Sequence, residues 1–513
     1  MIRVDISNRS MWDLSGEGRV FFLKKGFEVD GDLKKVESDF YPHLKKVFLT
    51  HKFVGNLGDV FTLSAPNDNG IDQFIFVGVG ELDQKKHENM EFLRRAIGHA
   101  VKELKRLEIK NALTKVENID LNLFGLDQTS FAKQFITTIL VAGYEFDGFK
   151  SKNGTSPWSG LVTACFDSVD SHDLENILFD SRAVGESVNF TRNLCDMPSN
   201  IATPEYVYEQ ARQVAEKFGF QCQAFGRDKA KELGMGGFVA VDEGSEKEGR
   251  FVEMIYSCGS PEAPTVALVG KGVTFDSGGL SLKPSSGMKG MKFDMCGAAS
   301  VVGAMRALSQ LKPRVNVVGL TPLVENMPSG RAARQDDIIT HLNGVTTEIE
   351  NTDAEGRLIL ADALAYAEKF HNPDVIIDIA TLTGACVVAL GHFFTGLMSK
   401  DDDLAHELIR VGEISGDWLW RLPLHDLYKP GVKSDVADIS NTGSRSYGAG
   451  TIKAGMFLSH FVSKTPWAHL DIAGTESAIP EAVHLGKGAS GVGVKLFVEF
   501  VLEFRKFARK QEL

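Results

Sequence analysis

Four carboxylates in the second half of the chain occupy positions where an α/β protein presents reactive side chains. Asp276 follows a glycine-rich stretch after a strand-like run, and Asp294 precedes a helical run of small and apolar residues. Asp353 and Glu355 lie between a strand-like run and another helical run. Carboxylates two positions apart on an extended segment point the same way. Each acid taken alone also fits a helix cap or an interaction with the helix dipole.

Taken together, the four carboxylates favour a metal site over four separate caps. Crowding them without a counter-charge would raise their pKa values and destabilise the fold, and metal ions would remove that conflict. Oxygen-rich ligation suits Mg²⁺ or Mn²⁺, and also a bridged pair of Zn²⁺ ions. Cys296, two residues after Asp294, could add a thiolate ligand, but an inert core thiol fits better because soft partner ligands are lacking.

Other catalytic chemistries lack their sequence signatures. Lys271 is followed by Gly272, which breaks the phosphate-loop spacing, and no G-x-G-x-x-G opens a helix there. No G-x-S-x-G elbow occurs, so a serine hydrolase is disfavoured. No H-E-x-x-H occurs either, and we interpret four isolated histidines as structural: His341, His392, His425 and His469.

The elements that must position these acids alternate between strand and helix. Strand-like runs cover residues 265–269, 315–320, 346–349, 375–380 and 469–472, and helical runs cover 298–311, 358–370 and 494–508. This alternation predicts a mixed, largely parallel sheet covered by helices, with ligand sites beyond the carboxyl ends of its strands. The fold class is therefore α/β.

We expect two domains. Residues 1–170 read as a small N-terminal α/β domain with a regulatory or architectural role, since no ligand cluster stands out in it. Residues 171–196 predict a connecting helix, because apolar residues recur at helical spacing without a glycine or proline pair. Residues 197–513 form the larger catalytic domain, in which Thr203-Pro204 predicts an N-cap and the first helical position.

Composition restricts the compartment and the partners. The 513 residues carry a formal net charge of −12, which disfavours nucleic acid as a partner. Because the six cysteines are widely spaced, we interpret them as free thiols in a reducing compartment. Neither a secretory h-region at the N-terminus nor a membrane-length apolar run is visible, so we expect a cytoplasmic protein without membrane contact.

In the motifs that contain these acids, the chain resembles the leucine aminopeptidase family, also called cytosol aminopeptidases. The octapeptide Asn351-Thr352-Asp353-Ala354-Glu355-Gly356-Arg357-Leu358 matches that family's signature without a mismatch. The segment 270–283 and Asp294 match its other blocks in order and spacing, and the resemblance extends through residues 379–385. The first domain matches in size and position only.

The resemblance implies a two-metal peptidase and assigns residue roles. Asp276 and Glu355 would bridge the ions, Lys271 and Asp294 would complete one metal shell, and Asp353 would complete the other. Four carboxylate charges then balance two divalent ions, with Lys271 binding as a neutral amine. The resemblance makes Lys283 and Arg357 catalytic without ligating a metal, and it places four residues in the substrate pocket: Asn351, Met291, Thr381 and Leu382.

The implied reaction is hydrolysis of the N-terminal peptide bond by a hydroxide that two metal ions activate. The ions would be Mn²⁺ or Zn²⁺, with Mg²⁺ possible in the exchangeable site. Lys283 would stabilise the oxyanion, and Arg357 would hold a bicarbonate ion that shuttles a proton. The family further implies a preference for leucine-like residues and a hexamer. The rival interpretations are a DNA-binding accessory protein, which the acidic charge disfavours, and an inactive structural homologue.

Overall fold

The computed structural model describes residues 2–67, 70–83, 86–115, 121–150, 158–166 and 169–511, and the chain folds into two compact units. The first unit comprises Met1–Glu186 and Ala478–Lys487, and the second comprises Ser187–Ser477 and Gly488–Leu513. Each unit is α/β, and the larger one contains a mixed sheet with a parallel centre. The predicted fold class is confirmed.

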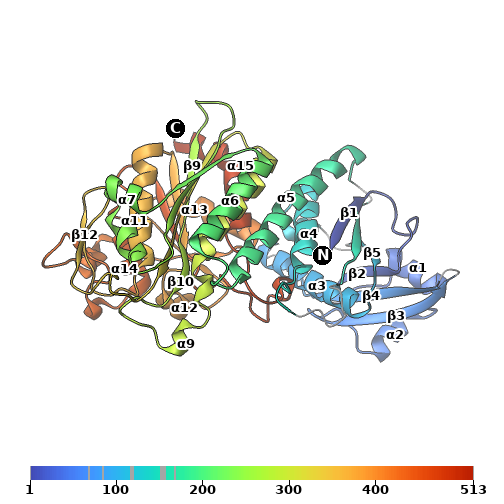
Figure 1. Ribbon diagram of the computed structural model, residues 1–513. Helices are drawn as coiled ribbons and strands as arrows, with labels where there is room; N and C mark the ends of the chain where they lie inside the picture. Colours follow the sequence, from blue (N-terminus) through green and yellow to red (C-terminus); the bar gives the residue numbers. More distant parts are fainter. Residues whose placement is uncertain are drawn as a thin grey trace. The chain divides into compact units, whose positions relative to one another are not determined.

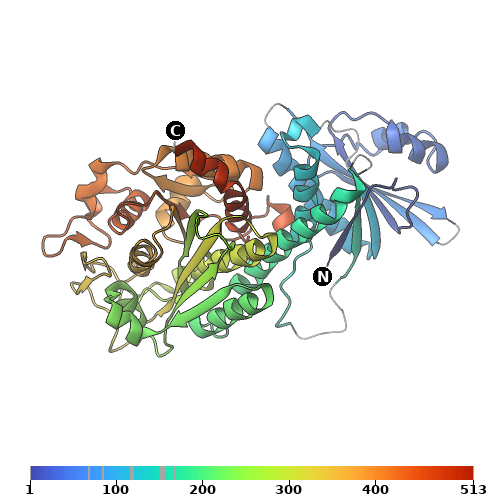
Figure 2. The same ribbon diagram turned by 90° about the horizontal axis from the view of Figure 1, so that it is seen from above.

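The first unit is built on a six-stranded sheet, drawn in blue and blue-green in Figure 2. Neighbouring strands run parallel except for the antiparallel pair of β3 and β4. One apolar cluster includes residues of α3 and α4, and a second, rich in phenylalanine, includes residues of α1 and α2. In sheet order the strands are β1 (Arg3–Ser7), β6 (Leu161–Cys165), β5 (Asn111–Lys115), β2 (Gly18–Lys24), β4 (Gly70–Gly80) and β3 (Val60–Asn67), and the helices are α1 (Gly31–Asp39), α2 (Leu44–Thr50), α3 (Lys86–Arg106), η1 (Leu121–Phe124) and α4 (Gln128–Ala142).

A late segment of the chain returns to the first unit. The short helix η6 (Val483–Leu485) lies against α3 and α4, and a Cβ atom on Gly98 would come within 2.4 Å of the His484 backbone nitrogen. Helix α5 (Ser171–Asp196) begins in the first unit and ends in the second.

The second unit contains a nine-stranded sheet whose four central strands β18, β14, β9 and β11 are parallel. The pairs β11–β8, β8–β7 and β15–β18 are antiparallel, whereas β15 and β16 are parallel, so the sheet is mixed. In sheet order the strands are β16 (Leu419–Arg421), β15 (Thr395–Ser399), β18 (Trp467–Asp471), β14 (Val375–Ala380), β9 (Thr265–Gly270), β11 (Asn316–Asn326), β8 (Arg250–Tyr256) and β7 (Gln221–Phe225), with β10 (Gly272–Asp276) paired to β11. A smaller sheet joins β12 (Ile338–Thr340), β13 (Thr346–Glu348) and β17 (Ile439–Ser440).

Helices cover both faces of this sheet (Figure 1). Helix α10 (Cys296–Leu311) packs on β9, β11 and β14 together with α6 (Pro204–Phe218) and α15 (Val494–Gln511), while α11 (Gly356–Tyr366) and α8 (Gly236–Asp242) cover the other face. The remaining helices are α7 (Arg227–Leu233), α9 (Ser285–Met288), η2 (Met291–Met295), η3 (Ala367–His371), α12 (Gly384–Leu390), α13 (Asp402–Ser415), η4 (Asp426–Val432), η5 (Arg445–Tyr447) and α14 (Gly450–Leu458).

Local signals in the sequence explain several boundaries. The hydroxyl of Thr203 accepts a hydrogen bond from the backbone N–H of Tyr206, and Pro204 opens α6 as expected. The helical run expected to reach residue 370 is an α-helix only to Tyr366, after which η3 continues as a π-helix. No helix within the described part of the chain has the length and apolar character that crossing a bilayer requires.

Candidate functional site

The carboxyl ends of the four central strands meet at one edge of the sheet and supply the inner wall of the candidate site. Because parallel strands all end at the same edge, residues far apart in sequence come together there. Two strands end in such a residue, Asp471 in β18 and Asn326 in β11, and two are directly followed by one, Thr381 after β14 and Lys271 after β9.

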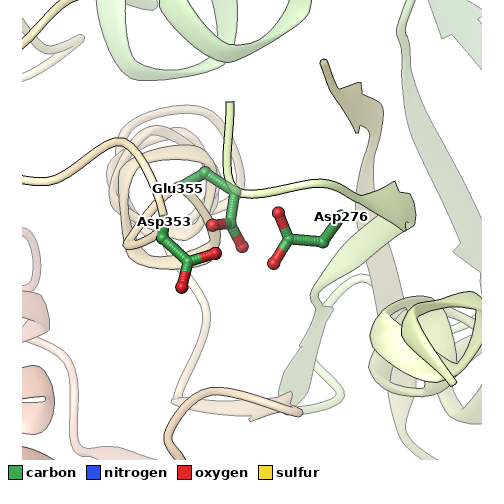
Figure 3. A group of neighbouring side chains, drawn as sticks. All are labelled: Asp276, Asp353 and Glu355. Carbon is green, nitrogen blue, oxygen red and sulfur yellow. The ribbon is translucent and has the colours of Figure 1, made fainter. Parts of the chain in front are cut away.

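Three carboxylates converge just beyond this edge. Asp276 ends β10, Asp353 lies in the turn before α11, and Glu355 occupies the N-cap position of that helix. One carboxylate oxygen from each residue lies within 4.8 Å of the other two, and Figure 3 shows the side chains pointing toward a common centre. Glu355 makes no side-chain cap hydrogen bond, so helix capping does not account for its position. The extended segment expected around Asp353 is a turn instead, but the acids still converge.

Two lysines place positive charge among these acids. The Nζ atom of Lys271 lies 2.7 Å from Asp294 Oδ1 and 3.1 Å from Glu355 Oε1. The Nζ atom of Lys283 lies 2.7 Å from Asp276 Oδ2 and also contacts Asp353. Each ammonium group therefore lies between two carboxylates, where it provides the positive charge that a divalent ion could supply.

Asp294 belongs to this cluster and not to the cap of α10. It lies in the short helix η2, and Met295 holds the N-cap position of α10. Asp294 Oδ1 accepts a 2.7 Å hydrogen bond from the Thr381 hydroxyl, whereas Oδ2 is buried and has no hydrogen-bond partner within the described ranges. A buried carboxylate oxygen without a donor suits a cation ligand.

The pKa shifts show that the acids outweigh the cations. Burial and the neighbouring Glu355 raise the pKa of Asp276 to about 6, and burial also raises the pKa of Asp294 and Asp353. Burial acts to raise the pKa of Glu355, but Lys271 holds it below its ordinary value. Burial alone would lower the pKa values of both lysines, yet the surrounding carboxylates raise them. More positive charge would thus stabilise the site, and the hard oxygen donors with one amine fit divalent metal ions.

Glycines and a threonine shape the backbone around the acids. Gly278 has a φ of +87°, and a Cβ atom there would lie 2.5 Å from the carbonyl oxygen of Ser281. A Cβ atom on Gly356 would lie 2.4 Å from Cε of Lys271, so this glycine leaves the space through which the lysine reaches the acids. The Thr352 hydroxyl donates to the Gly278 carbonyl oxygen at 2.7 Å and ties the two loops together.

Sequence reasoning missed two asparagines that organise the site. The Nδ2 group of Asn326 donates to Asp276 Oδ1 at 2.8 Å and lies 3.4 Å from Glu355 Oε2. Asn441 is fully buried and donates to the Asn351 carbonyl oxygen at 2.7 Å, and its own carbonyl accepts from Arg357 Nη1 at 2.7 Å. Asn326 ends β11, six residues beyond the predicted strand 315–320, so only a longer strand prediction could have indicated it, whereas no motif marks Asn441.

Arg357 lies in the first turn of α11, next to the acids in sequence but outside their hydrogen bonds. Its Nε atom is buried and has no hydrogen-bond partner in the described part of the chain. Burial lowers its pKa to about 10, against the opposing effect of Glu355 and Asp471. Lys453 is buried close by, and its pKa is lowered by burial and by the charge of Arg357. Two neighbouring cations of this kind suit an anion.

The four expected pocket residues lie around the acid cluster and are partly exposed. The backbone carbonyl of Thr381 accepts from Lys271 Nζ at 2.9 Å, and the N–H of Leu382 donates to Asp471 at 3.2 Å. Asn351 Oδ1 accepts from the Asp353 N–H at 2.9 Å, so its side chain shapes the turn. Met291 opens η2, the helix that carries Asp294.

The residues set aside have other environments. Each of the four histidines has a hydrogen-bond partner other than the acid cluster, and the partners are Asp362 and Thr347 for His341, Gly474 for His392, Leu427 for His425 and Asp378 for His469. Burial raises the pKa of the Cys296 thiol, which keeps it protonated. The interpretation of Cys296 as a core thiol agrees with this environment.

Comparisons with known proteins match most of the chain. A family model described as the catalytic domain of the cytosol aminopeptidase family matches residues 189–498, and one described as the N-terminal domain of the same family matches residues 20–153. Among curated relatives, a probable cytosol aminopeptidase of Geobacter sulfurreducens is 40% identical over 473 residues, covering 92% of this chain and 93% of its own. One from Desulfotalea psychrophila is 37% identical over 511 residues, covering 98% and 99%.

Solved structures with the same fold include a tomato leucine aminopeptidase mutant, with a TM-score of 0.87 and 30% identity over 98% of this chain and 97% of that one. The bottromycin maturation enzyme BotP in complex with Mn gives a TM-score of 0.82 and 32% identity over 96% of this chain and 100% of that one. One of these relatives thus holds Mn.

Proposed function

Because this chain belongs to the cytosol aminopeptidase family, it is an aminopeptidase that acts on peptides, and we propose that it does so with two divalent metal ions. The proposed reaction is hydrolysis of the N-terminal peptide bond, with a preference for leucine-like apolar first residues. The observation that carries the proposal is the convergence of Asp276, Asp353 and Glu355 beside Lys271 and Asp294.

The proposed ligand sets follow the contacts of the two lysines. Asp276 and Glu355 would hold both ions, with Asp294 and Lys271 completing one shell and Asp353 completing the other. Lys271 already lies within hydrogen-bond distance of Asp294 and Glu355, which supports a shared shell. When bound, Mn²⁺ or Zn²⁺, with Mg²⁺ possible in the all-oxygen shell, would lower the pKa of water and polarise the scissile carbonyl.

Lys283 would act on charge that appears during the reaction. Its ammonium group lies between Asp276 and Asp353, and the carboxylates hold its pKa above the ordinary value. A permanent cation placed there stabilises an oxyanion more than the neutral carbonyl that precedes it. We therefore assign Lys283 to oxyanion stabilisation.

Arg357 would hold a bicarbonate ion, whose oxygen atoms can pass a proton to the departing amine. The buried Nε atom, which lacks a hydrogen-bond partner within the described ranges, and the neighbouring Lys453 support an anion at this position. The contact with the Asn441 carbonyl oxygen fixes the guanidinium group.

The free amine of the substrate would bind beside Asp294, whose Oδ2 atom has no partner among the described residues. Anchoring the amine places the first carbonyl at the cluster and excludes internal bonds. Thr381, Leu382, Met291 and Asn351 would line the pocket for the first side chain. The proposal also includes a hexameric assembly in the cytoplasm, which the resemblance to the family supports.

Paired peptides test the proposal. Leucyl peptides with a free amine and their N-acetylated counterparts are incubated with the enzyme before chelation, after chelation and after readdition of Mn²⁺ or Zn²⁺, and products are identified by mass spectrometry. We expect stepwise removal of N-terminal residues from the free peptides only, abolished by chelation and restored by metal. Comparable cleavage of acetylated peptides would contradict amine anchoring, and full activity in chelator would contradict the metal assignment.

A further inference from the structure

Glu476 places a carboxylate at the same edge of the sheet as the acid cluster. It lies in the turn that follows β18, where its N–H donates to the Ile472 carbonyl oxygen at 3.0 Å and its carbonyl accepts from the Ser490 N–H at 2.9 Å. Asp471, the last residue of β18, fixes the neighbouring loop by accepting from the Leu382 N–H at 3.2 Å. The turn of Glu476 and the expected pocket residue Leu382 are thus both anchored at the end of β18.

The groups that interact electrostatically with Glu476 identify its neighbours. Its charge acts on the thiol of Cys296, which opens α10 two residues after Asp294. Asp471 and His392 act electrostatically on Glu476 in turn, and His392 is held by a 2.9 Å hydrogen bond between Nδ1 and the Gly474 carbonyl oxygen. The carboxylate therefore lies near the start of α10, the end of β18 and the His392 loop.

Among the described residues, only one of the two oxygen atoms of this carboxylate has a hydrogen-bond partner. Oε1 accepts a hydrogen bond from the Ser477 hydroxyl at 3.2 Å, while Oε2 is buried and has no hydrogen-bond partner among the described residues. Burial, together with the charge of Asp471, raises the pKa of Glu476 to about 7, although Ser477 and His392 act in the opposite direction. No lysine or arginine in the described part of the chain forms an ion pair with it. A buried acid in this condition lowers fold stability unless a ligand supplies the missing donor.

We propose that Glu476 refines the preference for apolar first residues: among side chains with an apolar stem, it selects those that end in a cation, lysine and arginine, by pairing with that charged end. The inference rests on the proposed function, because it names the substrate class of the same pocket. The aliphatic stem of such a residue would lie along Leu382 and Met291, where a leucine side chain would lie, and its cationic end would reach Oε2 of Glu476. The pocket thus combines an apolar wall with one charge-selective group.

The test compares peptides that differ only in the ε-amine of the first residue. Peptides starting with lysine and with norleucine are assayed at pH 8, where Glu476 is ionised. Hydrogen bonds to charged groups change affinity by about one to two orders of magnitude, so we expect kcat/KM for the lysine peptide to exceed that for the norleucine peptide by about tenfold or more. Glu476→Gln should remove most of this ratio while changing the size of the side chain little.

A matched control is available at the other end of the sheet. Glu262 is exposed in the loop before β9, so Glu262→Gln makes the same chemical change far from the site and should preserve the ratio. Glu476→Lys should reverse the charge preference and favour a first residue of glutamate over its neutral analogue glutamine.

The outcomes separate the two proposals. Absence of cleavage of every free peptide by the wild-type enzyme would overturn the proposed function itself. Cleavage of the norleucine peptide with a lysine-to-norleucine ratio of one or less would overturn the role of Glu476 alone. A ratio that favours lysine equally in the wild type and in Glu476→Gln would assign the selectivity to another group and would also overturn it.

Discussion

The two ends of the helical segment formed by α11 and η3 hold acids in opposite ways. At its start, Glu355 belongs to a group of four carboxylates that share two lysines, and burial raises the pKa of the other three. At its end, Glu368 accepts hydrogen bonds from the Ser463 hydroxyl at 2.7 Å and from the N–H groups of Ser463, Lys464 and Thr465 at 2.7 to 3.1 Å. Although burial opposes it, these donors lower the pKa of Glu368 to about 2.

The difference distinguishes an acid that stabilises the fold from acids whose environment suits a bound cation. Glu368 gains more from its donors than it loses by burial, so its ionised form stabilises the folded state. The three acids grouped with Glu355, which are Asp276, Asp294 and Asp353, lose more from burial and mutual repulsion than two ammonium groups return, so their ionised forms lower the stability of the metal-free protein. A raised pKa in a buried cluster of acids thus indicates a site that additional positive charge would stabilise.

Asp276→Asn is expected to change metal binding, activity and stability more than any other substitution considered. Loss of a carboxylate that would hold both ions should remove metal and lower kcat/KM by about 10³-fold or more. The metal-free variant should nevertheless be more stable than metal-free wild type at pH 8, by on the order of 1–3 kcal/mol. The reason is that an acid with a raised pKa loses stability as pH rises from its ordinary value, 3.8, through about 6.

Denaturant unfolding at pH 4 and pH 8, with metal analysis of the same samples, checks both the expected loss of metal and the expected gain in stability. The two proteins should differ less at pH 4, where Asp276 is protonated in the folded state. A variant that retains metal and turnover would show that Asp276 is not a ligand.

Lys283→Ala should reduce catalysis without emptying the metal site. Removing one preorganised stabiliser of an oxyanion lowers kcat by about 10²–10³-fold, while the proposed ligands remain. Lys289→Ala, an exposed residue after α9 on the same loop, is the matched control and should retain normal turnover. Metal content and kcat are measured together. Loss of metal with normal kcat after readdition would reverse the assigned role.

Asn326→Ala is expected to act through the acids that Asn326 bridges. The substitution removes an amide that donates to both Asp276 and Glu355. Loss of a group that orients metal ligands in this way lowers metal affinity or activity by about 10–100-fold. Asn316 begins the same strand, and its side chain donates to the carbonyl oxygens of Ser260 and Ala263 at the opposite end, so Asn316→Ala should leave metal affinity unchanged. Metal titration of the two variants is the comparison, and equal affinities would contradict a positioning role.

Glu368→Gln should have the smallest effect, on stability alone. The side chain is partly exposed, so we expect a loss of about 1 kcal/mol or less at pH 7. An acid with a lowered pKa contributes fully above its ordinary value of 4.5 and loses that contribution as pH falls toward 2. Unfolding free energies of wild type and variant should therefore converge at low pH, while kcat stays unchanged. A difference that persists at pH 2 would assign the effect to packing.

Much of the second unit could be predicted from local patterns. Strands 265–269 and 375–380 were predicted within one residue of β9 and β14, because buried parallel strands read as continuous apolar runs. Residues 351–358 indicate the family without any knowledge of the geometry, and the family models confirm it. The end of α11 was misjudged because the transition to a π-helix at Ala367 leaves no apolar signal.

Local sequence patterns are sufficient to identify the family, the alternation of strands and helices, and the acids and lysines proposed for the site. Which other groups donate hydrogen bonds to those acids depends on how distant segments pack. Asn326 reaches Asp276 across 50 positions of the chain, and Asn441 reaches Arg357 across 84, because the carboxyl ends of parallel strands and the loops beside them meet in space. The unpaired oxygen of Glu476 is likewise a property of the packed site, since local sequence patterns record neighbours along the chain and not the donors that other segments bring or withhold.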